Sequence, residues 1–211
     1  DQGTMYQTTT LFNAESNSIN GRYIYTKPDA AINDNKLWLY FGTGDIQKLQ
    51  TQSSSIVNRL YGIKDKDFPN FKTINSAGTI SQCKTGPNNC PGSSDLGWYV
   101  NLDKSKKVTA EPTVDKNLVW FPIYEPKPAA NICDSGNAIL ADVNNTCGDA
   151  TFRPLGKGVL SKVLVQGNNL IIGISGEADE GIESEGNLIT LESKAKGGTV
   201  EVQLEGWREN N

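Results

Sequence analysis

Short apolar stretches alternate with turn-forming residues along the whole chain, and three groups of these stretches follow the same order. Each group has a short strand, a turn that carries Asn, Asp or Gly, and a second, more apolar strand. This order is typical of a β-hairpin. The three predicted hairpins join residues 24–28 to 35–44, residues 108–112 to 116–124, and residues 159–163 to 168–176.

Further strand candidates follow each predicted hairpin. A third strand is predicted at 59–63, 138–142 and 188–191, and a fourth at 97–102, 150–153 and 199–204. Four antiparallel strands in each repeat are typical of a β-propeller blade. The blade units occupy about 22–102, 107–154 and 158–207, and an insertion at 65–96 accounts for the greater length of the first.

The repeat predicts an all-β fold: an incomplete β-propeller of about three four-stranded antiparallel blades, with one disulfide-bearing loop insertion. We take residues 1–211 as a single propeller portion. Because closed propellers need about 4–8 blades, an open end would expose an apolar face and unpaired strand edges. We therefore expect protein partners that complete the propeller. The alternative interpretation is an ordinary β-sandwich in which the repeat arises by chance.

Composition and charge exclude several functional classes. The chain has no histidine, so His-based catalytic triads and His-ligated metal sites are excluded. A net charge of −4 without a basic cluster argues against nucleic-acid binding. The longest apolar runs are shorter than a membrane-spanning helix requires, so we expect no membrane span.

The four cysteines are Cys83, Cys90, Cys133 and Cys147. Their spacing does not fit a zinc site, and disulfides are the better interpretation, which implies an oxidising compartment. Three connectivities are possible. We prefer Cys83–Cys90 with Cys133–Cys147, because each of these pairs lies inside one irregular stretch. The chain opens on polar residues rather than a signal peptide, so we expect a mature form or a piece of a longer protein.

A set of motifs in a fixed order resembles a known family. The motifs are Leu-Trp-Leu-Tyr-Phe-Gly-Thr-Gly-Asp at 37–45, Arg-Leu-Tyr-Gly-Ile-Lys-Asp at 59–65 and Gly-Trp-Tyr-Val-Asn-Leu at 97–102, with 110–112, 133–142 and 206–209 after them. In order and spacing, over nearly the whole chain, they resemble the C-terminal propeller of the PilC/PilY-type pilus-associated adhesins. The motif residues expected to be structural are Tyr40, Phe41, Gly42, Thr43, Gly44, Tyr61, Gly62, Gly97, Trp98 and Tyr99.

This resemblance implies a non-enzymatic, extracellular or outer-surface protein of a type IV pilus system. Such a protein would act in pilus assembly or tip adhesion by docking to partner chains, either the rest of the same adhesin or minor pilus subunits. Family members carry an Asp/Asn-rich calcium loop before the Tyr-Phe-Gly-Thr-Gly strand, and no such loop precedes Leu37. We therefore expect no cofactor and no metal.

Recognition is expected in the insertion, because loops on a rigid scaffold commonly carry binding residues. Phe68 and Phe71 are the candidate recognition residues there. We interpret the acidic run from Glu177 to Glu185 as a solvated loop. One alternative function is a structural subunit of an extracellular filament or surface layer. Another is a quinone-type propeller dehydrogenase, whose acidic cofactor site and repeated Trp motif are not visible in the sequence.

Overall fold

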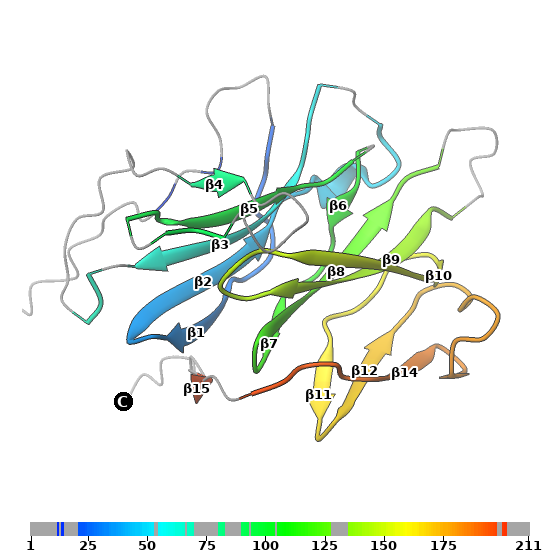
Figure 1. The fold of residues 1–211 in the computed structure, drawn as a ribbon. Coiled ribbons are helices and arrows are strands. Elements are labelled where there is room, and N and C mark those ends of the chain that lie inside the picture. The colour runs from blue at the N-terminus through cyan, green and yellow to red at the C-terminus, as the bar shows by residue number, and fades with distance from the viewer. Residues whose placement is uncertain are drawn as a thin grey trace, which may run out of the picture.

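The described residues fold into three β-sheets, which confirms the all-β prediction (Figure 1). The computed structural model describes residues 12, 14, 21–52, 55–65, 67–69, 80–82, 90–92, 94–103, 105–127, 135–197 and 200–201. Within these ranges the helical content is a single 3-10 turn, η1, at Ile46–Lys48. Each sheet is built mainly from one consecutive stretch of the chain. The predicted blade boundaries and the incomplete propeller of about three blades stay predictions.

The first sheet has six strands, five from the N-terminal part of the described chain and one, β15, from its C-terminal end. In spatial order they are β15 (Val200–Glu201), β1 (Asp29–Asn33), β2 (Lys36–Gly42), β3 (Arg59–Asp65), β5 (Gly97–Asn101) and β4 (Ser81–Gln82). All pairs are antiparallel except β4 with β5, which run parallel. The predicted insertion therefore contributes an edge strand to this sheet.

The second and third sheets follow along the chain. The second has β10 (Ala150–Lys157), β9 (Asn137–Asn144) and β8 (Leu118–Glu125), and two short strands, β6 (Lys107–Val108) and β7 (Thr113–Asp115), both pair with β8. The third has β11 (Leu164–Gln166), β12 (Asn169–Gly173), β14 (Leu188–Glu192) and β13 (Ser184–Glu185). All of these pairs are antiparallel.

The hairpin that opens each sheet turns through two residues, and this shifts its first strand from the predicted place. The turns are Asp34–Asn35, Lys116–Asn117 and Gly167–Asn168, with φ angles of 49° and 56° at the first pair. Positive φ at both positions suits the right-handed twist of a two-residue hairpin. The first strands are therefore β1, β7 and β11, and the predictions at 24–28, 108–112 and 159–163 were placed too early.

The misplaced segments nevertheless have a shared role, because each reaches the far end of the second strand of its hairpin. Gly44 N donates to Tyr23 O in the first sheet. Lys107–Val108 pair with Ile123 and Tyr124 in the second sheet, and Leu160 bridges Ile174 in the third. Each first strand is thus broken into two pieces, and the sequence pattern identified only the upstream piece.

The later strand predictions are confirmed with one exception. The candidates at 59–63, 97–102, 138–142, 150–153 and 188–191 lie in β3, β5, β9, β10 and β14. The candidate at 199–204 was assigned wrongly to the third unit, because β15 pairs with β1 of the first sheet. The preceding segment is held beneath the second sheet: Ser193 Oγ donates to Asp115 Oδ2, and Lys196 N to Asn117 Oδ1. These contacts direct the chain back toward β1 (Figure 1).

The second sheet lies between the other two and is buried on both faces. Alternate residues of β8 and β9 point in opposite directions. Val119, Phe121 and Ile123 pack against the first sheet, and Trp120 with Leu140 packs against the third. All five of these side chains are buried. Fully burying a side chain of this size stabilises a fold by roughly 1.5–3 kcal/mol, so these side chains make a large contribution to stability.

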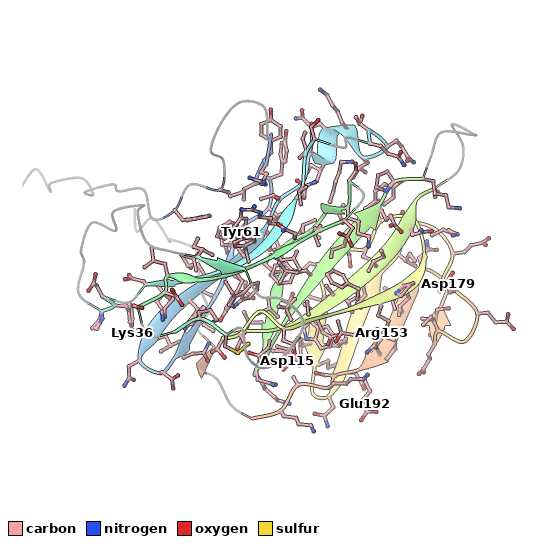
Figure 2. All side chains as sticks on the ribbon, turned by 45° about the horizontal axis from the view of Figure 1, so that its top comes forward. Lys36, Tyr61, Asp115, Arg153, Asp179 and Glu192 are labelled. Carbon is pink, nitrogen blue, oxygen red and sulfur yellow. A yellow bond between two sulfur atoms is a disulfide. The ribbon has the colours of Figure 1, made fainter. Side chains whose placement is uncertain are left out.

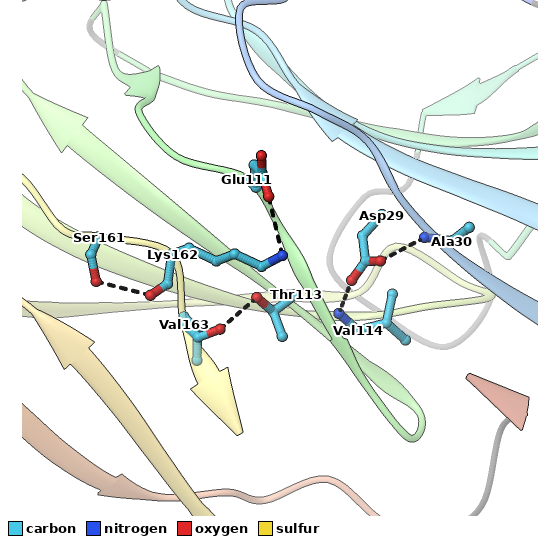
Figure 3. Close-up of polar contacts among 8 residues, drawn as sticks. All are labelled: Asp29, Ala30, Glu111, Thr113, Val114, Ser161, Lys162 and Val163. Atoms are coloured by element: carbon cyan, nitrogen blue, oxygen red, sulfur yellow. Dashed lines mark hydrogen bonds and ion pairs between the residues drawn. The ribbon is translucent and has the colours of Figure 1, made fainter. Parts of the chain in front are cut away.

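Polar contacts between the inner strands fix the sheets side by side (Figure 3). Asp29 Oδ2 accepts a hydrogen bond from Val114 N at 2.8 Å, which ties β1 to β7. Thr113 Oγ1 donates to Val163 O at 2.8 Å, which ties β7 to the segment before β11. Because each contact joins a side chain to a backbone group of the next sheet, the hairpins are held in register with one another.

A disulfide joins Cys90 to Cys147 across 57 residues of sequence, so the predicted pairing of neighbouring cysteines is wrong. Cys147 follows β9, in a turn where Asn144 Oδ1 accepts hydrogen bonds from Thr146 N and Cys147 N. This turn meets the end of the insertion beside Trp38, and the sequence pattern gave no sign of that meeting. Cys83 and Cys133 lie outside the described residues.

The disulfide gives a direct prediction. Peptide mapping without reduction should recover a linked peptide pair that contains Cys90 and Cys147. Replacing both residues with Ala should lower the free energy of unfolding by roughly 2–4 kcal/mol, because the bridge closes a long loop in the unfolded chain. Denaturant unfolding of the double variant measures this. Recovery of Cys90 linked to Cys83 would contradict the described structure.

Candidate functional site

The Tyr-Phe-Gly-Thr-Gly motif forms the joint between the first and second sheets. Val108 N donates to Thr43 O at 3.1 Å, which brings β6 against the end of β2. A Cβ atom on Gly42 would overlap the Val108 side chain, and one on Gly44 would crowd Lys107. The two glycines are therefore needed because the strand of the second sheet passes directly over their backbone.

Thr43 is fully buried at this joint, and its hydroxyl connects three segments. Its Oγ1 donates to Asn58 Oδ1 and accepts from Arg59 N. Asn58 Nδ2 in turn donates to Lys106 O at 2.8 Å. Buried polar groups cost free energy unless they are hydrogen-bonded, and here these partners satisfy the hydroxyl and the amide. The motif threonine thus has a structural role in the joint.

The motif aromatics divide between the two faces of the first sheet. Tyr40 and Trp98 are completely buried on the face toward the second sheet, with ring centroids 6.2 Å apart. Asn33 Nδ2 donates to the Tyr40 hydroxyl, and burial raises the pKa of Tyr40. Trp98 Nε1 donates to Asn145 O at 2.8 Å, which links β5 to the second sheet. These side chains build the core rather than an open binding surface.

The opposite face of the first sheet carries the other motif aromatics. Phe41 and Tyr61 stack with centroids 5.1 Å apart, and Phe12 packs on both rings. Burial raises the pKa of Tyr61, which Figure 2 shows on this sheet. The Arg59 guanidinium lies 4.1 Å from the centroid of the Tyr99 ring. The charged group on this face therefore packs against an aromatic ring.

Three glycines surround Trp98 and set its position. A Cβ atom on Gly62 or on Gly148 would overlap the indole ring. Gly97 has a φ of 137°, which side-chain-bearing residues rarely adopt, and its Cβ would meet the backbone of Gly62. Gly62, Gly97 and Gly148 thus leave the space that the Trp98 indole and its strand occupy.

The two recognition candidates are not brought together by the described structure. Phe68 is half-buried in a turn after β3, and Phe71 lies outside the described residues. The acidic run after β12 has exposed side chains at Glu177, Asp179 and Glu180, and Asp179 lies on the opposite side of the molecule from Lys36 (Figure 2). A recognition role for the insertion stays a prediction.

A pocket of about 370 Å³ lies where the loop around η1 meets the end of the motif joint, and the sequence analysis missed it. The lining residues are Gly21, Tyr23, Asp45, Lys48, Thr51, Gln52, Ile56, Asn58, Ser105 and Lys107. Lys107 is 5% exposed, and its Nζ donates to Leu49 O at 2.8 Å and to Thr51 O at 2.7 Å. The sequence feature that could have indicated this pocket is a lysine, Lys107, next to an apolar residue in a predicted strand.

The electrostatics of this pocket centre on Lys107. Desolvation lowers the pKa of its ammonium group, and the nearby Asp45 carboxylate acts in the opposite direction. Asp45 is itself fixed as the N-cap of η1, where its Oδ1 accepts a hydrogen bond from Gln47 N. The pocket thus combines a buried cation with one carboxylate whose orientation is set by the backbone.

In the part of the chain that the structure describes, no group of three or more Cys, Asp or Glu side chains is placed to hold a metal ion. Over the same residues, no helix is long and apolar enough to cross a membrane.

The packing around Trp98 gives a second prediction. Gly62→Ala should lower the free energy of unfolding by roughly 1–3 kcal/mol, because the added methyl group overlaps the indole ring. Thermal or denaturant unfolding measures the loss. Gly92→Ala is the matched control, since its Cβ would meet only Asp95 Oδ2 at 3.5 Å, an ordinary contact. Equal stability of the two variants would show that the indole is not fixed by Gly62.

Comparison with known proteins gives one informative similarity. No family model and no curated protein sequence matches the chain. Among solved structures, the crystal structure of the Pseudomonas aeruginosa PilY1 C-terminal domain is similar, with a TM-score of 0.51 and 11% sequence identity. The similarity covers 81% of this chain and 45% of that domain. The resemblance inferred from the motifs is therefore confirmed at the level of the fold: over most of its length, this chain has a PilY1-like fold.

Proposed function

We propose that the chain is a non-enzymatic, extracellular component of a type IV pilus system that acts by docking to other protein chains. In this proposal the three sheets are blades of an incomplete β-propeller, and the protein contributes to pilus assembly or tip adhesion. The PilY1-like fold supports the pilus connection. The observation that carries the docking mechanism is the outer face of the third sheet.

The outer face of the third sheet is apolar at its centre and exposed. Cross-strand partners share a face of a sheet, and the register pairs Leu164 with Ile171 and Leu188 with Gly173. Leu164 is 61% exposed and Leu188 is 53% exposed, while Ile171 between them is partly buried. Polar residues surround these three side chains on the same face: Gln166, Asn169, Thr190 and Glu192.

The edge of this sheet offers a second means of association. β11 is the outermost strand, all three of its residues are exposed, and no strand of the described chain pairs with its outer edge. An unpaired edge strand presents a row of backbone donors and acceptors to another chain. The partner that fits both features is a protein segment with an apolar β-sheet face, such as a further blade-like unit.

The sheets within the chain show how such a face is normally covered. The second sheet has neighbours on both faces, and Phe12, Ala14 and Ile80 pack over the outer aromatics of the first sheet. The third sheet has a described neighbour on its inner face only. A partner sheet on its outer face would give the third sheet the environment that the second already has.

The proposal predicts a functional defect without a folding defect. A chain with Leu164→Lys and Leu188→Lys should keep its unfolding midpoint, because both side chains are exposed. In piliated cells, this double variant should reduce surface pili or adhesion when it replaces the natural protein. Counts of pili by electron microscopy and a surface-adhesion assay measure the two outcomes.

Ser135→Lys is the control, because it adds a charge at an exposed position away from the third sheet. Cells with this variant should resemble cells with the unchanged protein. Full piliation and full adhesion in cells with the double variant, at equal protein levels, would contradict docking through this face.

A further inference from the structure

The pocket beside the motif joint holds a buried positive charge that the proposed docking face does not involve. Lys107 begins β6, and its aliphatic stem packs over Gly44, so the ammonium group is directed into the loop around η1. Two of its three N–H groups donate to the carbonyl oxygens of Leu49 and Thr51. In the described part of the chain, no carboxylate forms an ion pair with it and the third N–H has no partner.

A buried ammonium group without a carboxylate partner is costly, because carbonyl dipoles offset only part of the lost hydration. The pocket lining adds a second cation, Lys48, and one carboxylate, Asp45, so the lining carries one excess positive charge. The Asp45 carboxylate is already engaged at the N-terminus of η1. The lining can therefore accept one more negative group, and Lys107 offers it a hydrogen-bond donor.

The entrance to the pocket is apolar and aromatic. Tyr23 lines the pocket and is 53% exposed, and its ring meets that of Tyr25 edge to face, with centroids 5.9 Å apart. Ile56 lines the same wall, and the neighbouring Val57 is 39% exposed. Exposed apolar side chains gathered around a polar pocket are typical of binding sites.

From these features we propose that the pocket binds a carboxylate group of a peptide, with the ammonium groups of Lys107 and Lys48 holding the carboxylate and the Tyr23–Ile56 wall holding an apolar side chain beside it. Charge-assisted hydrogen bonds to carboxylates are about twice as strong as neutral ones, which suits an ammonium group already shielded from water. A volume of about 370 Å³ accommodates one or two residues.

The proposal is independent of the pilus role, and capped amino acids test it on the full chain. The probes are N-acetyl-leucine with a free carboxylate and N-acetyl-leucinamide, which has the same shape without the charge. Titration followed by NMR should move the amide signals of residues 45–52 and 105–107. We expect the free acid to bind at least about tenfold more tightly than the amide, since only the acid meets the ammonium groups.

A third probe distinguishes the two peptide sources of a carboxylate. N-acetyl-aspartate N-methylamide presents the carboxylate on a side chain, whereas N-acetyl-leucine presents it as a chain terminus. Tighter binding of the first assigns the pocket to an internal acidic residue, and tighter binding of the second assigns it to a C-terminus. Either result supports the carboxylate site.

Variants separate binding from the structural role of Lys107. Lys107→Met should abolish the preference for the acid, but it also removes the two contacts to the loop around η1. Lys48→Gln and Tyr23→Ala leave those contacts in place and should each weaken binding of the free acid several-fold. Lys196→Gln, at an exposed position on the segment before β15, should leave binding unchanged.

Any of three results would overturn the proposal. One is equal binding of the acid and the amide to the unchanged protein. Another is no shift of the pocket signals with any of the three probes at saturating concentration. Loss of binding in Lys196→Gln to the same extent as in Lys48→Gln would also overturn it, because the acid would then be responding to net charge alone.

Discussion

The structure depends on two central strands, β8 and β9, that are largely buried on both faces. In β8 and β9, residues that point one way pack against the first sheet and residues that point the other way pack against the third. Such strands are stable only when both faces are covered. The positions of the other two sheets follow from this requirement, and the chain cannot expose the second sheet without losing most of its core.

The residues where the sheets meet allow the sheets to pack closely enough to cover one another. Gly42, Gly44 and Gly62 let backbone or an indole ring approach where any larger residue would collide. Thr43 and Asn58 satisfy the polar groups that this close approach buries. Packing between the sheets therefore accounts for these motif residues, whose order suggested the family resemblance. The binding features that we propose lie elsewhere, at the outer face of the third sheet and in the pocket around Lys107.

The sequence predicted the strands that supply most of the core, because a run of apolar residues indicates a buried strand without information from elsewhere in the chain. The run from Leu118 to Tyr124 indicates a fully buried strand whatever surrounds it. The first strands of the hairpins were misplaced because two-residue turns such as Lys116–Asn117 determine which residues pair, and the apolar pattern does not. The Cys90–Cys147 bridge and the Lys107 pocket depend on segments that meet only in the folded chain, so no sequence pattern identified them.

The proposed association through the third sheet and the burial of the second sheet are two consequences of one arrangement. A sheet with a neighbour on one face only should open more easily than the sheet between two neighbours. Native-state hydrogen exchange on the isolated chain measures this difference most directly. We expect the slowest exchange at hydrogen-bonded amides of β8 and β9, and opening of β11–β14 at a clearly lower free energy. Exchange from β12 and β14 as slow as that from β8 and β9 would contradict this expectation.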